Sequence, residues 1–118
     1  MAACQPDETV TAYGGEGTWR LTHLDSKSAN LNLTLNLQSN GDVMVSGSCA
    51  TLKARQTEPY PWFALDNTRE THTECEISAT EQDAISAIQS ATLVEVSNDT
   101  LLLTDADALG LTFVRISD

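Results

Sequence analysis

The feature that most constrains the fold is a run of leucines at every second position between residues 31 and 37. In the segment NLNLTLNLQ the residues between the leucines are all polar. A β-strand places alternate side chains on one face, whereas a helix would scatter them around its circumference. The segment is therefore predicted to be a strand with one buried face, formed by Leu31, Leu33, Leu35 and Leu37.

The turn that follows, Ser39-Asn40-Gly41, sets the pairing of the next strand. A two-residue turn at Asn40-Gly41 would place leucines opposite polar residues. A three-residue loop with Gly41 in the left-handed conformation keeps the apolar face apolar, so this register is predicted. It pairs Leu37 with Val43, Leu35 with Val45 and Leu31 with Cys49, and it turns Cys49 inward.

The ends of the chain give a tether and a set of strands. Residues 1–16 are polar and small, without periodicity, and predict a flexible tether. The run GTWRLTHL, from Gly17, alternates as a strand does. Near the C-terminus, a two-residue turn at 98–99 and a second turn through 105–110 lead into the last strand, LTFVRI. The first of these turns pairs Val96 with Leu101 and Val94 with Leu103.

The middle of the chain is less regular. Pro59 and Pro61 flank Tyr60 and interrupt any ladder, which predicts a loop or a sheet edge, and a short strand follows at 62–65. The run TRETHTECEI predicts a strand with one face in water. Its inward residues would be Thr71, Thr73, Cys75 and Ile77, and its outward residues Glu70, His72, Glu74 and Glu76.

One helix is predicted, over about residues 79–90. Ser78 and Glu81 have the spacing of a capping box at its start. A narrow apolar stripe of Ala84, Ile85, Ile88 and Ala91 can lie on a sheet or close a barrel end.

These elements predict a mainly β fold with some α content. It is a small barrel-like or sandwich-like meander of about seven or eight antiparallel strands with one short helix. With 118 residues, the chain has room for one core. The expected organisation is a tether at 1–16 and a single domain at 17–118.

The charge excludes some partners. Six basic residues against seventeen acidic ones give a net charge of −11. Nucleic acids bind through neutralisation of their phosphates by Lys and Arg, so no nucleic-acid partner is expected. A basic patch for anionic lipid is excluded on the same ground. Contact with a membrane is expected only through an N-terminal lipid anchor, and the domain is expected to be a monomer.

No recognisable catalytic or metal-binding pattern occurs. His72 and Cys75 are close in sequence but His23 is distant, which is poor spacing for zinc. The run at 105–110 resembles half of a calcium loop, but a plain turn is the better interpretation. Without a nucleophile elbow, a P-loop or a dinucleotide fingerprint, the chain is expected to have no cofactor and no enzymatic activity.

Five segments, taken in order, resemble the META/HslJ family of bacterial envelope proteins, a family of unknown function. They are GTWRL, SGSCA, THTEC, EQDAI and NDTLLLTDADALGLTFV, and together they span about residues 17–116. The chain departs from the family at Ser48-Cys49-Ala50, where the family usually has Gly-Cys-Asn, and at Thr73-Glu74, where it has Met-Ala. The resemblance implies a compact β-barrel-like domain, often on envelope lipoproteins and loosely linked to stress and antibiotic tolerance, with no established catalytic activity.

Cys49 and Cys75 are interpreted as a disulfide. Both point inward on the predicted strands, and two such cysteines on neighbouring strands can meet the distance that the bond needs. An exported domain would lie in an oxidising compartment, where such bonds persist. The alternative is a pair of buried free thiols that pack as small apolar groups.

Cys4 resembles a lipidation site. Bacterial lipoproteins are cleaved before a cysteine that follows small residues, and Ala2-Ala3-Cys4 has this form. Gln5 after the cysteine favours, by analogy, the outer membrane of a Gram-negative cell, facing the periplasm. The alternative is an ordinary N-terminus with an incidental cysteine.

Tyr60, Trp62 and Phe63 form the densest aromatic cluster, rimmed in sequence by Lys53, Arg55 and Arg69. The cluster is a candidate interaction surface. The competing and favoured interpretation is that Trp62 and Phe63 fill the core.

The leading hypothesis is therefore a non-catalytic envelope lipoprotein that acts on an unidentified envelope protein or ligand. One alternative is a small β-barrel protease inhibitor that inserts residues 5–16 into a protease cleft. Another is a carrier of a small apolar ligand, which would need an open cavity.

Overall fold

Strands make up most of the computed structural model, which describes residues 9–25, 27–28, 31–73, 75–107 and 109–117. Within these residues the elements are η1 (Val10–Tyr13), β1 (Gly17–Leu24), β2 (Lys27–Ser28), β3 (Thr34–Leu37), β4 (Asp42–Ser46), β5 (Ala50–Gln56), β6 (Leu65–His72), α1 (Ala79–Ser90), β7 (Ala91–Ser97), β8 (Thr100–Asp105) and β9 (Gly110–Ser117).

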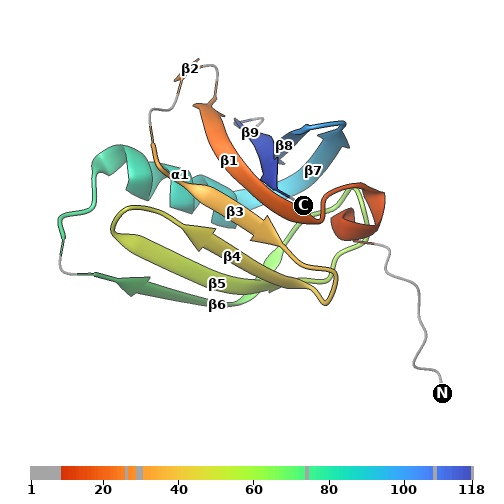
Figure 1. Cartoon of the computed structure of the whole chain (residues 1–118), viewed down its shortest axis with the longest axis horizontal. Helices are drawn as coiled ribbons and strands as arrows, with labels where there is room; N and C mark the ends of the chain where they lie inside the picture. The colour runs from red at the N-terminus through yellow and green to blue at the C-terminus, as the bar shows by residue number, and fades with distance from the viewer. Residues whose placement is uncertain (1–8, 26, 29–30, 74, 108, 118) are drawn as a thin grey trace.

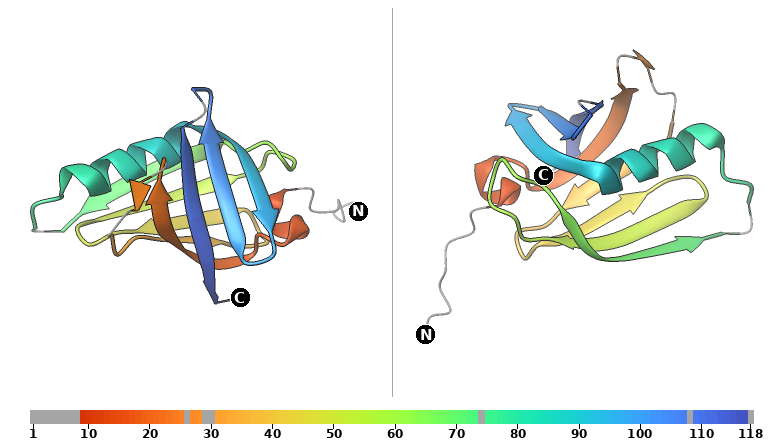
Figure 2. Two further views of the ribbon diagram at one scale, coloured as in Figure 1. Left: turned by 90° about the horizontal axis from the view of Figure 1, so that it is seen from above. Right: turned by 180° about the vertical axis from the view of Figure 1, so that it is seen from behind.

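The strands form one antiparallel sheet in the order β6-β5-β4-β3-β1-β9-β8-β7, with β2 paired to β1. The sheet curls into an open half-barrel with two walls, and α1 lies in the opening between them (Figures 1 and 2). One wall is β3–β6 and the other is β1, β9, β8 and β7. The predicted mainly β meander with one helix is confirmed, and the described residues form nine strands.

The alternating leucines face the core as predicted. Leu33, Leu35 and Leu37 are each at most 1% exposed. Their partners are also as predicted, because Leu37 pairs with Val43 and Leu35 with Val45, and Gly41 has a φ of 94°. This confirms the three-residue loop, in which glycine adopts the left-handed conformation without a steric penalty.

The predicted pairing of Leu31 with Cys49 is wrong. β3 begins only at Thr34 and β4 ends at Ser46. The reason is that the backbone folds back at this point, where the Gly47 N–H donates to the Ala50 carbonyl. The ladder is therefore too short to include Leu31, which is half-buried.

The C-terminal strands follow the predicted register. Val96 pairs with Leu101 and Val94 with Leu103 around the turn at Asn98, whose φ is 56°. The next turn is closed by the Asp105 carboxylate, whose Oδ1 accepts the N–H groups of residues 107 and 109 at 2.9 Å each. This bonding identifies the segment as a turn, the interpretation favoured over a calcium loop.

The fold begins earlier than Gly17. Val10 is 0% exposed, and the Trp19 indole N–H donates to the Gly15 carbonyl at 2.9 Å. Residues 9–16 thus belong to the packed domain, which corrects the predicted boundary of the tether at residue 16. A single valine in a polar stretch has no periodicity, so its burial left no sequence signal. Residues 1–8 lie outside the described part of the chain.

Helix α1 is confirmed over residues 79–90, and Ser78 caps it by accepting the Glu81 N–H at 3.1 Å. The predicted apolar stripe is buried against the sheet. In the described part of the chain, no helix is both long enough and apolar enough to cross a bilayer.

Strand β6 corrects the prediction for residues 70–77. It ends at His72, and its residues from Asp66 onward are exposed on both faces. Its facing is also opposite to the prediction, since Glu70 lies opposite buried Leu52 and His72 opposite buried Ala50. β6 extends past the core, so the alternation of its side chains carried no information about burial.

The two edges of the sheet differ. Residues 59–63 lie along β7 and form backbone hydrogen bonds with its outer edge, where a further strand would otherwise pair. The Phe63 N–H donates to the Thr92 carbonyl at 2.9 Å, and the Val94 N–H donates to the Pro61 carbonyl at 2.8 Å. β6 is the other end of the strand order.

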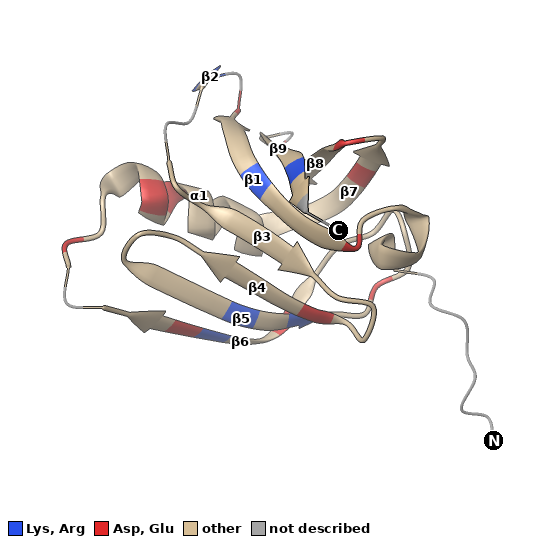
Figure 3. Cartoon of the chain, viewed as in Figure 1, with Lys and Arg blue, Asp and Glu red and all other residues tan. Residues whose placement is uncertain are grey.

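Three of the six basic residues, Lys53, Arg55 and Arg69, lie on β5 and β6 (Figure 3). They line a hollow of about 570 Å³ on this wall. Arg55 is paired with Asp42 at 2.9 Å, whereas Lys53 and Arg69 lie directly opposite each other.

Arg69→Thr is expected to stabilise the protein, because like charges directly opposite in a sheet repel each other. The gain should be about 0.5 kcal/mol at low salt, measured by urea unfolding. Arg20→Thr is the control, since exposed Arg20 lies opposite Thr34 and Val114. Equal effects of the two substitutions would contradict the argument.

Candidate functional site

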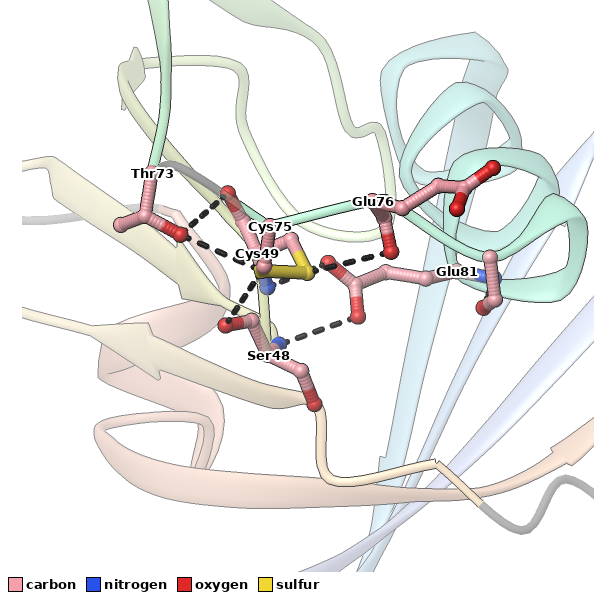
Figure 4. Close-up of a disulfide and its surroundings, with 7 residues drawn as sticks. Ser48, Cys49, Thr73, Cys75, Glu76 and Glu81 are labelled. Atoms are coloured by element: carbon pink, nitrogen blue, oxygen red, sulfur yellow. Dashed lines mark hydrogen bonds between the residues drawn. A yellow bond between two sulfur atoms is a disulfide. The ribbon is translucent and has the colours of Figure 1, made fainter.

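A single turn holds the first candidate site. Residues 47–50 join β4 to β5, and the turn is tied to the segment that leads into α1 (Figure 4). The disulfide between Cys49 and Cys75 is present, with a Cα–Cα distance of 5.6 Å. The Thr73 N–H also donates to the Cys49 carbonyl at 2.9 Å. The two cysteines predicted to pair are therefore paired.

The environment of the two cysteines differs from the prediction in one respect. Cys49 is 7% exposed, as its predicted inward facing requires. Cys75 is exposed and follows the end of β6, so it is not an inward residue of a strand. The connection from β6 to α1 brings it back over the β4–β5 turn instead.

Glu81 makes the second attachment to this turn. It is only 3% exposed, and its carboxylate accepts the N–H groups of Ser48 and Cys49 at 3.0 Å each. Gly47 lies so close that a Cβ there would be 2.6 Å from Glu81 Oε2. The turn thus forms a cradle of backbone amides around a carboxylate, and the absence of a side chain at Gly47 leaves room for it.

The groups of this cluster have a structural role. The two sulfur atoms are bonded to each other, and both carboxylate oxygens of Glu81 accept hydrogen bonds from the backbone. These groups are committed to holding the start of α1 on the β4–β5 turn. We call Cys49, Cys75, Glu81 and the turn 47–50 the helix lock.

Sequence reasoning assigned Glu81 only to a helix cap. Ser78 caps α1 as its spacing from Glu81 predicts, but the Glu81 side chain reaches residues 33 and 32 positions earlier. A local pattern cannot reveal a partner at that distance. A glycine directly before Ser48-Cys49 was the available signal, because close approach of another group often requires glycine.

The aromatic segment is the second candidate site, and its residues have separate roles. Phe63 is 2% exposed and fills the core, as the favoured interpretation predicted. Trp62 is 55% exposed and does not fill the core, which corrects that interpretation. Trp62 instead forms a β-bridge with Leu93 on the β7 edge, so its side chain remains outside.

Tyr60 is half-buried and fixed at both ends. Its hydroxyl accepts the Val96 N–H at 3.2 Å, and its ring stacks on Tyr13 with the centroids 4.7 Å apart. Tyr13 is 53% exposed. The exposed aromatic side chains of this region are therefore Tyr13, from η1, and Trp62. We call η1 with residues 59–63 the aromatic face.

Gln56, which sequence reasoning missed, holds this segment in place. It is 2% exposed. Its Nε2 donates to the carbonyls of Glu58 and Trp62 at 3.1 and 3.2 Å, and its Oε1 accepts the Ala64 N–H at 3.1 Å. A buried side-chain amide thus replaces the strand partner that the two prolines prevent.

Gln56→Ala is expected to lower the free energy of unfolding by about 2 kcal/mol, because it leaves several backbone groups without partners. Faster amide hydrogen exchange should follow at residues 57–64, while the β3–β4 hairpin stays protected. Gln38→Ala is the control, since Gln38 is exposed. Unchanged exchange at 57–64 would show that Gln56 does not hold the segment.

The other predicted site residues are placed as follows. Cys4, the predicted lipidation site, lies outside the described residues. His72 pairs with Glu70 at 2.6 Å, and the His23 ring bonds the Thr22 hydroxyl. Within the ranges that the structure describes, no three His, Cys, Asp or Glu side chains gather into a metal site.

Comparisons with known proteins agree with this architecture. The model of the META domain family matches residues 9–118. A DUF4847 family protein from Bacteroides vulgatus ATCC 8482 has a TM-score of 0.70 at 11% identity, with 92% of this chain and 99% of that chain covered. A protein from Burkholderia xenovorans has a TM-score of 0.66 at 16% identity, with 98% and 94% covered. A comparison with curated proteins finds no significant match.

Proposed function

The chain belongs to the META domain family, and we propose that it is a non-catalytic lipoprotein domain of the bacterial envelope. In this proposal Cys4 carries the lipid, on the periplasmic side of the outer membrane. The folded domain supports or binds another envelope component under stress.

The disulfide is the observation that carries this proposal. Disulfides persist in oxidising compartments and are rare in the cytosol, where thiols are kept reduced. Here the bond is part of the helix lock, since the same turn holds Glu81. A domain whose helix is fixed in this way is suited to the periplasm. The chemistry of the lock also supports a non-catalytic role, because its sulfur and carboxylate groups are already bonded.

The experiment is a peptide map of the protein isolated from whole cells of its bacterial source, after thiols are alkylated in intact cells. The proposal expects a Cys49–Cys75 crosslink and a lipid-modified peptide that contains Cys4. Cys4→Ser should release the protein from the membrane fraction. Unmodified Cys4 with alkylated Cys49 and Cys75 would refute the assignment to the envelope.

The two alternative functions are less well supported. An inhibitor that inserts residues 5–16 into a protease needs this segment to be free, but Val10 is buried and η1 packs against β7. A carrier needs interior space, whereas large side chains such as Trp19, Phe63 and Phe113 occupy the half-barrel at 2% exposure or less. Absence of protease inhibition at micromolar concentration would remove the first alternative.

A further inference from the structure

Two large aromatic side chains are exposed at the end of the domain where the chain enters it. Among the described residues, Trp62 and Tyr13 are the most exposed of the large hydrophobic side chains, at 55% and 53%. Both belong to the aromatic face, where η1 and residues 59–63 lie side by side against the edge of β7 (Figures 1 and 2).

Contacts within the fold hold these two rings in their exposed positions. Tyr13 is held by its stack on Tyr60, and the hydroxyl of Tyr60 is fixed to Val96. Trp62 is held by its bridge to Leu93 and by the Gln56 amide on its carbonyl. Ordered apolar groups at the surface mark contact sites more often than scattered ones do.

The position of the aromatic face relative to Cys4 limits what it can contact. Five residue steps separate Cys4 from Thr9, the first residue that the structure describes. A fully extended chain spans at most about 3.6 Å per residue, so this segment reaches no further than about 18 Å. Val10, the next residue, is buried in the core. A lipid on Cys4 would therefore hold η1 close to the bilayer.

We propose that the aromatic face rests on the lipid bilayer, with Tyr13 and Trp62 in the headgroup region. Trp and Tyr favour this region because their rings have an apolar body and a polar group. The inference rests on the proposed function for its anchor. It departs from the expectation that only the anchor meets the membrane, because Tyr13 and Trp62 would form a second contact.

The net charge of the protein indicates which lipid headgroups the aromatic face would contact. With a net charge of −11, the domain gains nothing from anionic headgroups and is repelled by them. The contact is therefore apolar, and a zwitterionic surface suits it best. An anchor makes the contact intramolecular, so that two aromatic side chains suffice where a free domain would dissociate.

In the test, the domain is coupled chemically to vesicles through Cys4, in place of lipidation by the cell. Of the three cysteines, Cys49 and Cys75 are bonded to each other, so Cys4 is the thiol left for a maleimide phospholipid in phosphatidylcholine vesicles. The readout is quenching of tryptophan emission by brominated phosphatidylcholine. Of the two tryptophans, Trp19 is 0% exposed and Trp62 is 55% exposed, so Trp62 is the one able to reach lipid.

The expected result is a blue shift and loss of the Trp62 emission on brominated vesicles, unchanged by salt. Trp62→Phe should leave only unquenched Trp19 emission. Tyr13→Ser should reduce the quenching, whereas Met44→Ser, which removes an exposed apolar side chain from β4, should not. Trp62 emission that stays unquenched by lipid and accessible to acrylamide overturns the proposal and leaves the face open to a protein partner. Because the coupling is chemical, this outcome is independent of whether cells lipidate Cys4.

Discussion

Glu81→Ala is expected to lower the free energy of unfolding by about 4 kcal/mol, since each hydrogen bond to a charged group contributes about 1.5–3 kcal/mol and its loss leaves a donor unpaired. The two donors are the N–H groups of Ser48 and Cys49, which Glu81 accepts at 3.0 Å. The side chain is 3% exposed, so water cannot readily take its place. Urea unfolding followed by circular dichroism measures the change.

The control for Glu81→Ala is Asp83→Ala, which removes one exposed carboxylate from the same helix and changes the net charge equally. It should cost well under 1 kcal/mol, the typical size of an interaction with the helix dipole. Glu81→Gln keeps the shape but offers one acceptor where two are needed, so it should fall between the two. If Glu81→Ala and Asp83→Ala had the same effect, the carboxylate would not hold the turn.

Gly47 provides an independent test of the cradle. A Cβ at this position would lie 2.6 Å from Glu81 Oε2 and 2.7 Å from its Cδ. Gly47→Ala should therefore cost about 1–3 kcal/mol, the usual cost of overpacking. In the Glu81→Ala background the same substitution should cost much less, because the carboxylate is gone. Equal costs in the two backgrounds would mean that Gly47 does not make room for Glu81.

The sequence predicted those parts of the fold in which a strand has one buried and one exposed face. The leucines of β3 are the clearest case, since a slip of one residue would expose all of them. The prediction of the buried face of β6 was wrong for the opposite reason. Residues 66–72 are exposed on both faces, so the alternation of their side chains carries no information about burial. The burial of Val10 was not predicted, because one buried residue in a polar segment produces no periodic pattern.

The candidate sites were predicted only in part, because their partners are distant in the chain. Cys49 and Cys75 were paired correctly, although only Cys49 faces inward and Cys75 is exposed beyond the end of β6. Glu81 and Gln56 each bind backbone groups through a side chain, and any residue can supply a backbone group. Apart from a glycine such as Gly47, which leaves room for Glu81, the sequence does not mark the partner, and burial of the polar side chain is the first sign of it.

Removing the disulfide is expected to lower the free energy of unfolding by about 3–4 kcal/mol, from the entropy of a closed loop of this size in the unfolded chain. The two cysteines are 26 positions apart. The double substitution Cys49→Ala with Cys75→Ala gives this change without leaving either partner of the bond as a free thiol. A reducing agent should bring the wild-type protein to the same urea midpoint. Cys4→Ser, the control, should not change it.

The slope of the urea transition separates the two attachments of the helix lock. Loss of the disulfide lets the unfolded chain expand, so the slope should increase, since it scales with the surface exposed on unfolding. Glu81→Ala acts on the folded state and should leave the slope unchanged. If the disulfide variant unfolded with an unchanged slope and a loss of under 1 kcal/mol, Glu81 and the core packing of α1 would hold the turn without the covalent bond. The fold would then not require the covalent bond.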